Sequence, residues 1–277
     1  MKCCTIDEVE LFLANPDEIE VEWIGQQDAL NQLIASWLKV DENDIPLNPR
    51  ILGKPGVGKT TLAYCAGKKL NKNVYIFQAT MDTRPEDLII TPVIGEANQI
   101  KYHASSLVTA MIEGGVCVLD EGNRMPEKSW ASIAPLLDNR RYVESIIAGI
   151  KVKAHPEFRF VTTMNSDASV YEIPEYIHSR LQPQITITWP TSKEEFNILK
   201  FNLPFSSKDI LNLIVDFLQN AHASDQPYTV RDGINIARYM LKLEVQNKKL
   251  SYELKKQAFT QVLGDNCLEF WNEYRYE

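Results

Sequence analysis

The sequence predicts an α/β fold in which helices cover a parallel sheet, followed by a small all-helical domain. Between residues 50 and 190, short β-type runs alternate with runs of helical periodicity. The β-type runs are apolar on both faces, which is typical of strands buried between helices in a parallel sheet. After about residue 190 only helical periods remain. We therefore expect an α/β domain over residues 1–190 and a helical domain over residues 191–277.

The elements of the first domain are expected to alternate along the chain, as a parallel sheet requires. The expected strands are RILG (50–53), NVYIFQA (73–79), VCVLD (116–120) and FRFVTTM (158–164). The expected helices are TTLAYCAGKKL (60–70), SSLVTAMIEGG (105–115) and the segment from Glu127 to Asp138.

Two segments interrupt this alternation, and we interpret both as inserted hairpins. PVIGEANQIKYH (92–103) and RRYVESIIAGIKVKAHPEF (140–158) each hold two short strand-like runs around a turn that contains glycine. Plain surface loops are the alternative for both segments.

The second domain is expected to begin with a capped helix. TSKEEF places Thr191 three residues before Glu194, which is the spacing of a capping box. Further helical periods follow in DILNLIVDFLQNA (209–221) and RDGINIARYMLKLE (231–244). The C-terminal run of residues 252–277 matches no pattern that we can assign.

The charge balance argues against broad binding to nucleic acid. The chain has 29 Lys plus Arg against 37 Asp plus Glu, a formal net charge of −8, although a local basic patch is compatible with this total. The apolar runs are all shorter than the roughly 20 residues of a membrane span. The N-terminus has acidic residues where a signal peptide has basic ones. We expect a cytoplasmic protein with no membrane contact.

The cysteines agree with a cytoplasmic placement. They number five, at Cys3, Cys4, Cys65, Cys117 and Cys267, and they form no C-x-x-C pair for zinc. We assign no metal held only by protein ligands. Adjacent Cys3 and Cys4 are either a redox device or incidental thiols in a mobile terminus, and we expect the latter.

The segment GKPGVGKT, residues 53–60, has the spacing of a phosphate cradle. Its glycines let the backbone curl so that N–H groups face phosphate oxygens at the start of a helix. Lys59 is expected to reach the β and γ phosphates and the Thr60 hydroxyl to ligate Mg²⁺, whereas Pro55 shapes the loop and donates nothing. A glycine-rich turn with an accidental Lys-Thr pair is the alternative. The residues expected to bind nucleotide here are Gly53, Pro55, Gly56, Val57, Gly58, Lys59, Thr60 and Thr61.

Polar residues at the ends of two later strands are candidates for catalysis. Asp120 is expected to hold Mg²⁺ through its water shell, and Glu121 to polarise the attacking water. Asn165 ends a buried strand and is expected to position this water or contact the γ phosphate. The alternatives are solvated turn acids for the pair and a turn former for Asn165.

Two arginines complete the candidate set. Arg180 in YIHSRL and Arg231 in YTVRDG could each supply a guanidinium fork to a phosphoryl transition state. Solvated surface charges are the alternative for both.

The order GKPGVGKT, VLDEGNR, TTMN, SRL and VRD resembles an AAA+ ATPase of the MoxR and dynein-related (midasin-like) branch. The resemblance spans about residues 22–245, and its most specific part is LDEGNRMPEKSWASIAPLLDNRRYV followed by a strand to Asn165. It implies an AAA+ P-loop NTPase core with a helix-2 insert and a pre-sensor-1 hairpin, then a helical lid. Gly122 departs from the branch, which usually has an apolar residue there. The implied roles are Walker A for Gly53 to Thr60, Walker B for Asp120 and Glu121, sensor 1 for Asn165, an arginine finger toward a neighbouring subunit for Arg180, and sensor 2 for Arg231.

The resemblance also implies the activity and the partners. It implies ATP with Mg²⁺, a homo-oligomeric hexameric ring, and remodelling or activation of a protein client such as a von Willebrand factor A domain protein. Nucleic acid is expected only through a partner, if at all. The first alternative is a McrB-like, GTP-dependent motor subunit of a restriction or defence nuclease, because TTMNSD loosely resembles the M-N-T-x-D segment of that group. The second is a non-catalytic nucleotide switch, which an intact Glu121 argues against.

Overall fold

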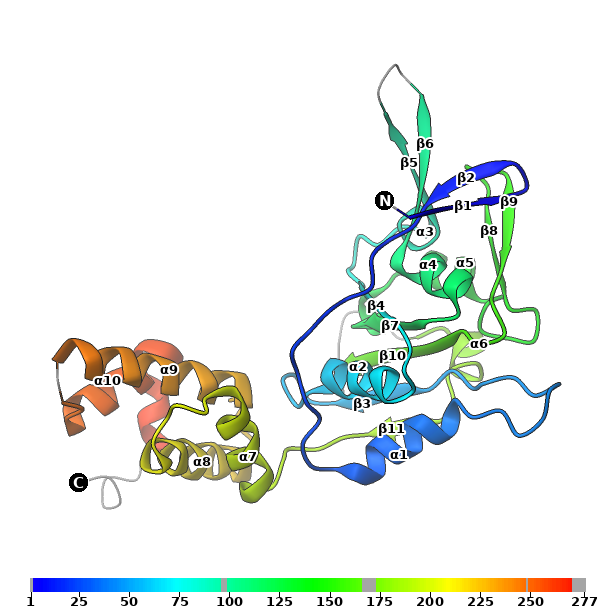
Figure 1. Cartoon of the computed structure of the whole chain (residues 1–277). Helices are drawn as coiled ribbons and strands as arrows, with labels where there is room; N and C mark the ends of the chain where they lie inside the picture. Colours follow the sequence, from blue (N-terminus) through cyan, green and yellow to red (C-terminus); the bar gives the residue numbers. More distant parts are fainter. Residues whose placement is uncertain (1, 96–98, 166–172, 248, 271–277) are drawn as a thin grey trace. The chain divides into compact units, whose positions relative to one another are not determined.

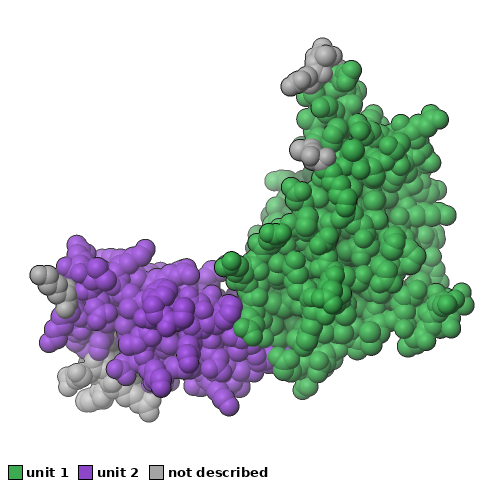
Figure 2. Space-filling model, viewed as in Figure 1, with its two compact units in different colours: residues 1–23, 27–53, 58–187 green, residues 24–26, 54–57, 188–277 purple. Residues whose placement is uncertain are grey.

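The computed structural model describes residues 2–95, 99–165, 173–247 and 249–270. The chain divides into two compact units, shown in Figure 2. Unit 1 comprises residues 1–23, 27–53 and 58–187, and unit 2 comprises residues 24–26, 54–57 and 188–277. The final change of unit follows Ile187, close to the change of sequence pattern near Pro190.

Unit 1 is built on a parallel sheet with the strand order β11-β3-β10-β7-β4 (Figure 1). The strands are β3 (Arg50–Gly53), β4 (Val74–Gln78), β7 (Val116–Asp120), β10 (Arg159–Asn165) and β11 (Gln184–Thr186). This confirms the predicted fold class and the expected strands. The edge strand β11 was not predicted, although its signal is present: QITIT (184–188) alternates polar and apolar residues, and Ile185 and Ile187 are buried.

Helices pack on both faces of this sheet. They include α1 (Gln27–Ser36), α2 (Lys59–Lys69), α4 (Ser106–Glu113) and α5 (Glu127–Ile133). Cys117 and Leu119 of β7 share a core with residues of α4 and α5. Val116 points to the opposite face and packs against α2. There it lies so close to Gly67 that a Cβ added to this glycine would be 3.2 Å from Val116 Cγ2. Alternate residues of a strand point to opposite faces, so β7 is apolar on both.

One expected helix of unit 1 is shorter than predicted. Helix α5 ends at Ile133, and turns rather than helix follow it to Asp138. Pro135 explains the early end, because it has no backbone N–H with which to continue the hydrogen bonds of the helix. The short elements α3 (Pro85–Leu88) and α6 (Glu175–His178) add single turns elsewhere.

Both inserted hairpins are confirmed. Strands β5 (Ile90–Ile94) and β6 (Ile100–Ala104) pair antiparallel, and the expected turn between them includes residues 96–98, which lie outside the described part. Strands β8 (Tyr142–Ser145) and β9 (Ile150–Lys153) also pair antiparallel. The assignments of the first hairpin as the helix-2 insert and of the second as the pre-sensor-1 hairpin stay predictions.

The expectation of a mobile N-terminus around Cys3 and Cys4 is wrong. Strands β1 (Cys3–Ile6) and β2 (Val9–Phe12) form an antiparallel pair, and β2 pairs in parallel with β6 in the sheet β1-β2-β6-β5. Leu11 is fully buried in this arrangement. The segment is ordered by a strand that lies about 90 residues further along the chain, so no local pattern announced it.

Unit 2 is helical. Its elements are α7 (Ser192–Asn202), α8 (Lys208–Ala223), α9 (Val230–Asn247), α10 (Tyr252–Leu263) and the 3-10 helix η3 (Asp265–Phe270). The capping box is confirmed, because Glu194 N donates to Thr191 Oγ1 at 3.4 Å and Thr191 N donates to Glu194 Oε2 at 2.8 Å. The unassigned C-terminal run forms α10 and η3, and it contributes Phe259 and Cys267 to the core.

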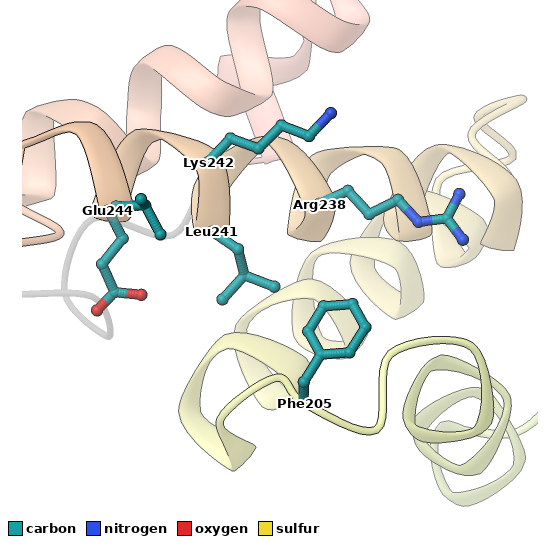
Figure 3. A pocket seen from close by; sticks show the side chains of 6 residues that line it. Phe205, Arg238, Leu241, Lys242 and Glu244 are labelled. Atoms are coloured by element: carbon teal, nitrogen blue, oxygen red, sulfur yellow. The ribbon is translucent and has the colours of Figure 1, made fainter.

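A hollow of about 680 Å³ lies on unit 2 (Figure 3). Phe205 from the α7–α8 connection and Leu241 from α9 approach each other across it. Phe205 is 72% exposed, so this hollow is an open apolar surface feature rather than part of the core. Its lining residues are Phe205, Arg238, Leu241, Lys242, Glu244 and Val245. Among the described residues, every helix is too short or too polar to cross a lipid bilayer.

Candidate nucleotide-binding site

The phosphate cradle connects β3 to α2. Strand β3 ends at Gly53 and α2 begins at Lys59. Gly56 and Gly58 have φ angles of 79° and 96°, a left-handed conformation that glycine adopts without the steric penalty of a Cβ. Gly58 is the N-cap of α2 and makes no side-chain cap hydrogen bond, and the first turn of a helix is where backbone N–H groups can bind an anion. The local geometry therefore has the features that phosphate binding requires.

Lys59 connects this loop to the candidate residue Asn165. Its side chain is nearly buried, with 7% of its surface exposed, and Nζ donates to Gly53 O at 2.9 Å and to Asn165 Oδ1 at 2.8 Å. The parallel register of β10 and β3 causes this meeting, because it places Asn165 opposite Gly53. The Lys59 ammonium group is thus held between the ends of β3 and β10.

Thr60 and Asp120 form an oxygen-rich group beside Lys59. Thr60 Oγ1 donates to Asp120 Oδ1 at 2.6 Å. Thr163 Oγ1 donates to the same carboxylate oxygen at 2.5 Å. Mg²⁺ prefers hydroxyl, carboxylate and water oxygens, so the residues present fit a magnesium ion.

Glu121 follows β7 in an unusual backbone conformation. Its φ angle is 54°, and its backbone N–H donates to Thr163 Oγ1 at 3.1 Å. Its carboxylate oxygen Oε2 accepts a hydrogen bond from Gln78 Nε2 at 3.1 Å and lies 3.0 Å from Arg124 Nε. The structure therefore orients both the backbone and the carboxylate of Glu121.

Sequence reasoning missed three of these contacts, made by Gln78, Arg124 and Thr163. The signal for Gln78 was a polar residue at the end of the otherwise apolar strand β4, where it pairs with Asp120 in the sheet register. The signal for Thr163 was a polar residue inside a strand predicted to be buried, and the structure buries it completely. Arg124 lies three residues after Glu121, and nothing in the sequence distinguished it from a surface charge.

The departure at Gly122 has a steric explanation. A Cβ at this position would lie 2.3 Å from Thr162 Oγ1 and 3.1 Å from Trp130 Cζ2. A side chain does not fit without a shift of the neighbouring strand or of the α5 tryptophan. Glycine is therefore required by the close approach of the segment after β7 to β10.

Arg180 contacts residues outside the group formed by Lys59 and its neighbours. One terminal nitrogen donates to Tyr176 O at 2.8 Å, and the other lies 3.4 Å from Asp138 Oδ2. Hydrogen bonding from Arg140 is the main cause that lowers the pKa of Asp138, with Arg180 adding a smaller effect. The segment between Asn165 and the helix before Arg180, residues 166–172, lies outside the described residues.

The remaining predicted residues lie along the cradle and in unit 2. Val57 is buried and Pro55 is exposed, and Thr61 is in the first turn of α2. Arg231 is the second residue of α9 in unit 2, and its side chain is exposed. The nucleotide-binding and catalytic roles of all these residues stay predictions.

Comparisons with known proteins match both the sequence and the fold. A family model described as the AAA domain of the dynein-related subfamily matches residues 50–181. The denitrification regulatory protein NirQ of Stutzerimonas stutzeri is 25% identical over 202 residues, which cover 73% of this chain and 66% of NirQ. Protein NorQ of Paracoccus denitrificans is 24% identical over 168 residues, covering 61% of this chain and 56% of NorQ. This chain therefore spans less than two thirds of either relative.

Among solved structures, the RuvB Holliday junction branch migration motor of Thermotoga maritima has a similar fold. The TM-score is 0.58 at 15% identity, and the match covers 87% of this chain and 70% of RuvB. At this identity the likeness concerns the fold alone.

Proposed function

We propose that this chain is a MoxR-like AAA+ ATPase that binds ATP with Mg²⁺ and hydrolyses it. Residues 50–181 match the model of the dynein-related AAA domain, and NirQ and NorQ are similar in sequence. One observation carries the proposal. Lys59 donates a hydrogen bond to Asn165, and the next residue, Thr60, donates one to Asp120, where β3, β7 and β10 end. Ligands of open parallel sheets bind at the carboxyl ends of the strands, so this group lies where a nucleotide is expected.

Each residue has a distinct proposed task. The cradle N–H groups and Lys59 bind the phosphates, and the oxygens of Thr60 and Asp120 hold the metal ion. When bound, Mg²⁺ neutralises charge on the transferring phosphoryl group. Glu121 accepts a proton from the attacking water and orients it, and Asn165 holds that water or the γ phosphate.

The proposed output is remodelling or activation of a partner protein by a ring of subunits. AAA+ proteins typically assemble as rings, and a ring lets Arg180 of one subunit serve the nucleotide of the next. The similarity to NirQ, which is named a denitrification regulatory protein, supports a regulatory role. A von Willebrand factor A domain protein is the client class that we propose, and a hexamer is the proposed assembly.

The test measures nucleotide turnover and nucleotide binding separately. Wild-type protein is expected to release phosphate from ATP only with Mg²⁺. Glu121→Gln should lose turnover by about a hundredfold or more while it still binds nucleotide, because only the proton acceptor is removed. Lys59→Ala should weaken binding itself. Near-normal turnover by Glu121→Gln contradicts the assignment of the catalytic carboxylate.

A competition experiment with ATP and GTP tests the nucleotide. We propose ATP, because the chain resembles MoxR-like ATPases. A clear preference for GTP would instead favour the McrB-like motor of a nuclease system.

A further inference from the structure

Thr163 lies completely buried in β10, and its hydroxyl contacts both acidic residues at the end of β7. Its hydrogen is donated to Asp120 Oδ1 at 2.5 Å. Its oxygen accepts the backbone N–H of Glu121 at 3.1 Å. A hydroxyl has one hydrogen and two lone pairs, so this single group connects two neighbouring acids of different proposed roles.

The two hydrogen bonds restrain the direction of the Asp120 carboxylate and the backbone conformation of Glu121. Asp120 Oδ1 also accepts from Thr60 Oγ1 at 2.6 Å, so two hydroxyls from different elements fix the direction of this carboxylate. Glu121 has φ 54° and ψ 39°, a conformation that few residues other than glycine adopt. Such a conformation persists only where the surroundings hold it.

We propose that Thr163 is a positioning residue for hydrolysis, acting through Asp120 and Glu121. This inference rests on the proposed function and adds a residue to it. Thr163 sets the direction of the metal-binding carboxylate, and it holds the turn that aims the Glu121 side chain. Loss of the Thr163 hydroxyl therefore weakens Mg²⁺ binding and slows hydrolysis, but it does not change the binding of nucleotide without metal.

The experiment compares three variants of the full chain. Thr163→Val keeps the shape of the side chain but removes the hydroxyl, and Thr163→Ser keeps the hydroxyl. Thr162→Val is the matched control, because Thr162 is equally buried on the same strand and its hydroxyl donates to Leu119 O at 2.9 Å rather than to an acid. Both valine variants thus lose one buried side-chain hydroxyl and its donated hydrogen bond.

Thr163→Val is expected to lower kcat for ATP by about tenfold or more and to raise the Mg²⁺ concentration for half-maximal turnover. This scale follows from the loss of hydrogen bonds to a charged group. Thr163→Ser should recover most of both values, and Thr162→Val should stay within about threefold of wild type in both.

A binding measurement gives a second readout that is independent of turnover. The dissociation constant of a non-hydrolysable ATP analogue is measured with Mg²⁺ and with EDTA. Thr163→Val should weaken binding with Mg²⁺ and leave binding in EDTA unchanged, which also shows that the variant is folded.

The outcomes separate this inference from the proposed function. If wild type hydrolyses ATP and Thr163→Val keeps its kcat and Mg²⁺ dependence, Thr163 is a structural residue and the inference is overturned while the ATPase proposal stands. Equal losses in Thr163→Val and Thr162→Val also overturn it. If wild type neither binds nor hydrolyses ATP, the proposed function itself fails.

Discussion

Gly122 lets the segment after β7 lie close to β10, because glycine has no side chain. It follows Glu121, whose backbone is left-handed, and it begins the 3-10 turn η2 (Gly122–Arg124). The neighbouring strand approaches so closely that a Cβ would lie 2.3 Å from Thr162 Oγ1. Real Cβ atoms do not tolerate that distance, so the fit of the acidic turn against β10 depends on the absence of a side chain.

The first residue-scale prediction concerns Gly122→Ala. We expect it to lower the free energy of unfolding by about 1–3 kcal/mol, the usual cost of overpacking. ATP turnover should also fall, because the adjacent Glu121 must move with its turn. Urea denaturation measures the stability and phosphate release measures the turnover.

A double-mutant cycle tests the cause. Thr162→Ala removes the oxygen that the new Cβ would meet, so Gly122→Ala should cost clearly less stability in that background than in wild type. Equal costs in the two backgrounds would show that Thr162 is not the source of the strain.

At the scale of elements, α7 and α8 enclose a buried pair of titratable residues. Glu195 is 0% exposed, its Oε2 accepts from Gln219 Nε2 at 2.9 Å, and its Oε1 lies 3.9 Å from His222 Nδ1. The His222 ring stacks on Trp189 with centroids 4.1 Å apart. Burial raises the pKa of Glu195 to about 7 and lowers the pKa of His222. Both groups are therefore favoured in their neutral forms.

This burial predicts a pH-dependent stability. Between the ordinary Glu pKa of 4.5 and about 7, folded Glu195 keeps a proton that the unfolded chain releases, so its contribution to stability falls as the pH rises. The lowered pKa of His222 acts in the opposite direction below its ordinary value of 6.5. Glu195→Gln removes only the effect of Glu195. The free energy of unfolding of this variant, minus that of wild type, should therefore be larger at pH 8 than at pH 5, by on the order of 1–3 kcal/mol.

Thermal denaturation of both proteins at the two pH values measures the difference. Glu253→Gln is the control, because Glu253 is exposed on α10 and the substitution changes the net charge equally. A stability difference between Glu195→Gln and wild type that is the same at pH 5 and pH 8 would falsify the buried-carboxyl explanation.

At the scale of the whole molecule, the prediction concerns assembly. In this chain the Arg180 guanidinium contacts Tyr176 and Asp138, outside the Lys59 and Asp120 group. An arginine that acts on a neighbouring subunit makes turnover depend on assembly, and such a residue can contribute roughly 10³ or more in rate. We expect specific activity to fall on dilution and Arg180→Ala to lose most of its activity while it still binds nucleotide.

Mixing experiments provide the control for this prediction. Arg180→Ala and Lys59→Ala are both inactive in the proposed scheme, but a mixed interface joins an intact cradle to an intact arginine. A mixture should therefore regain partial activity. Constant activity per subunit on dilution to a proven monomer would instead make Arg180 an ordinary surface arginine and remove the basis of the ring.

The sequence alone determined the features whose causes are local. Apolar strands alternating with helices predicted the parallel sheet, because burial on both faces leaves a continuous apolar run. The cradle was predictable because Gly56 and Gly58 supply the left-handed conformations at the required spacing, directly before a helix. The Thr191–Glu194 capping box was predictable for the same reason, since its hydrogen bonds join residues three apart.

The tertiary structure decided what depends on strands and helices distant in the sequence. Thr163 contacts Asp120 and Gln78 contacts Glu121 only because β10 and β4 both pair with β7. That register follows from sheet assembly rather than from any local period. Pairing with β6 likewise orders the N-terminal strands, although the sequence had led us to expect a mobile N-terminus. Glu195 looks like an ordinary first-turn acid in the sequence, and only packing between α7 and α8 removes its carboxyl from water.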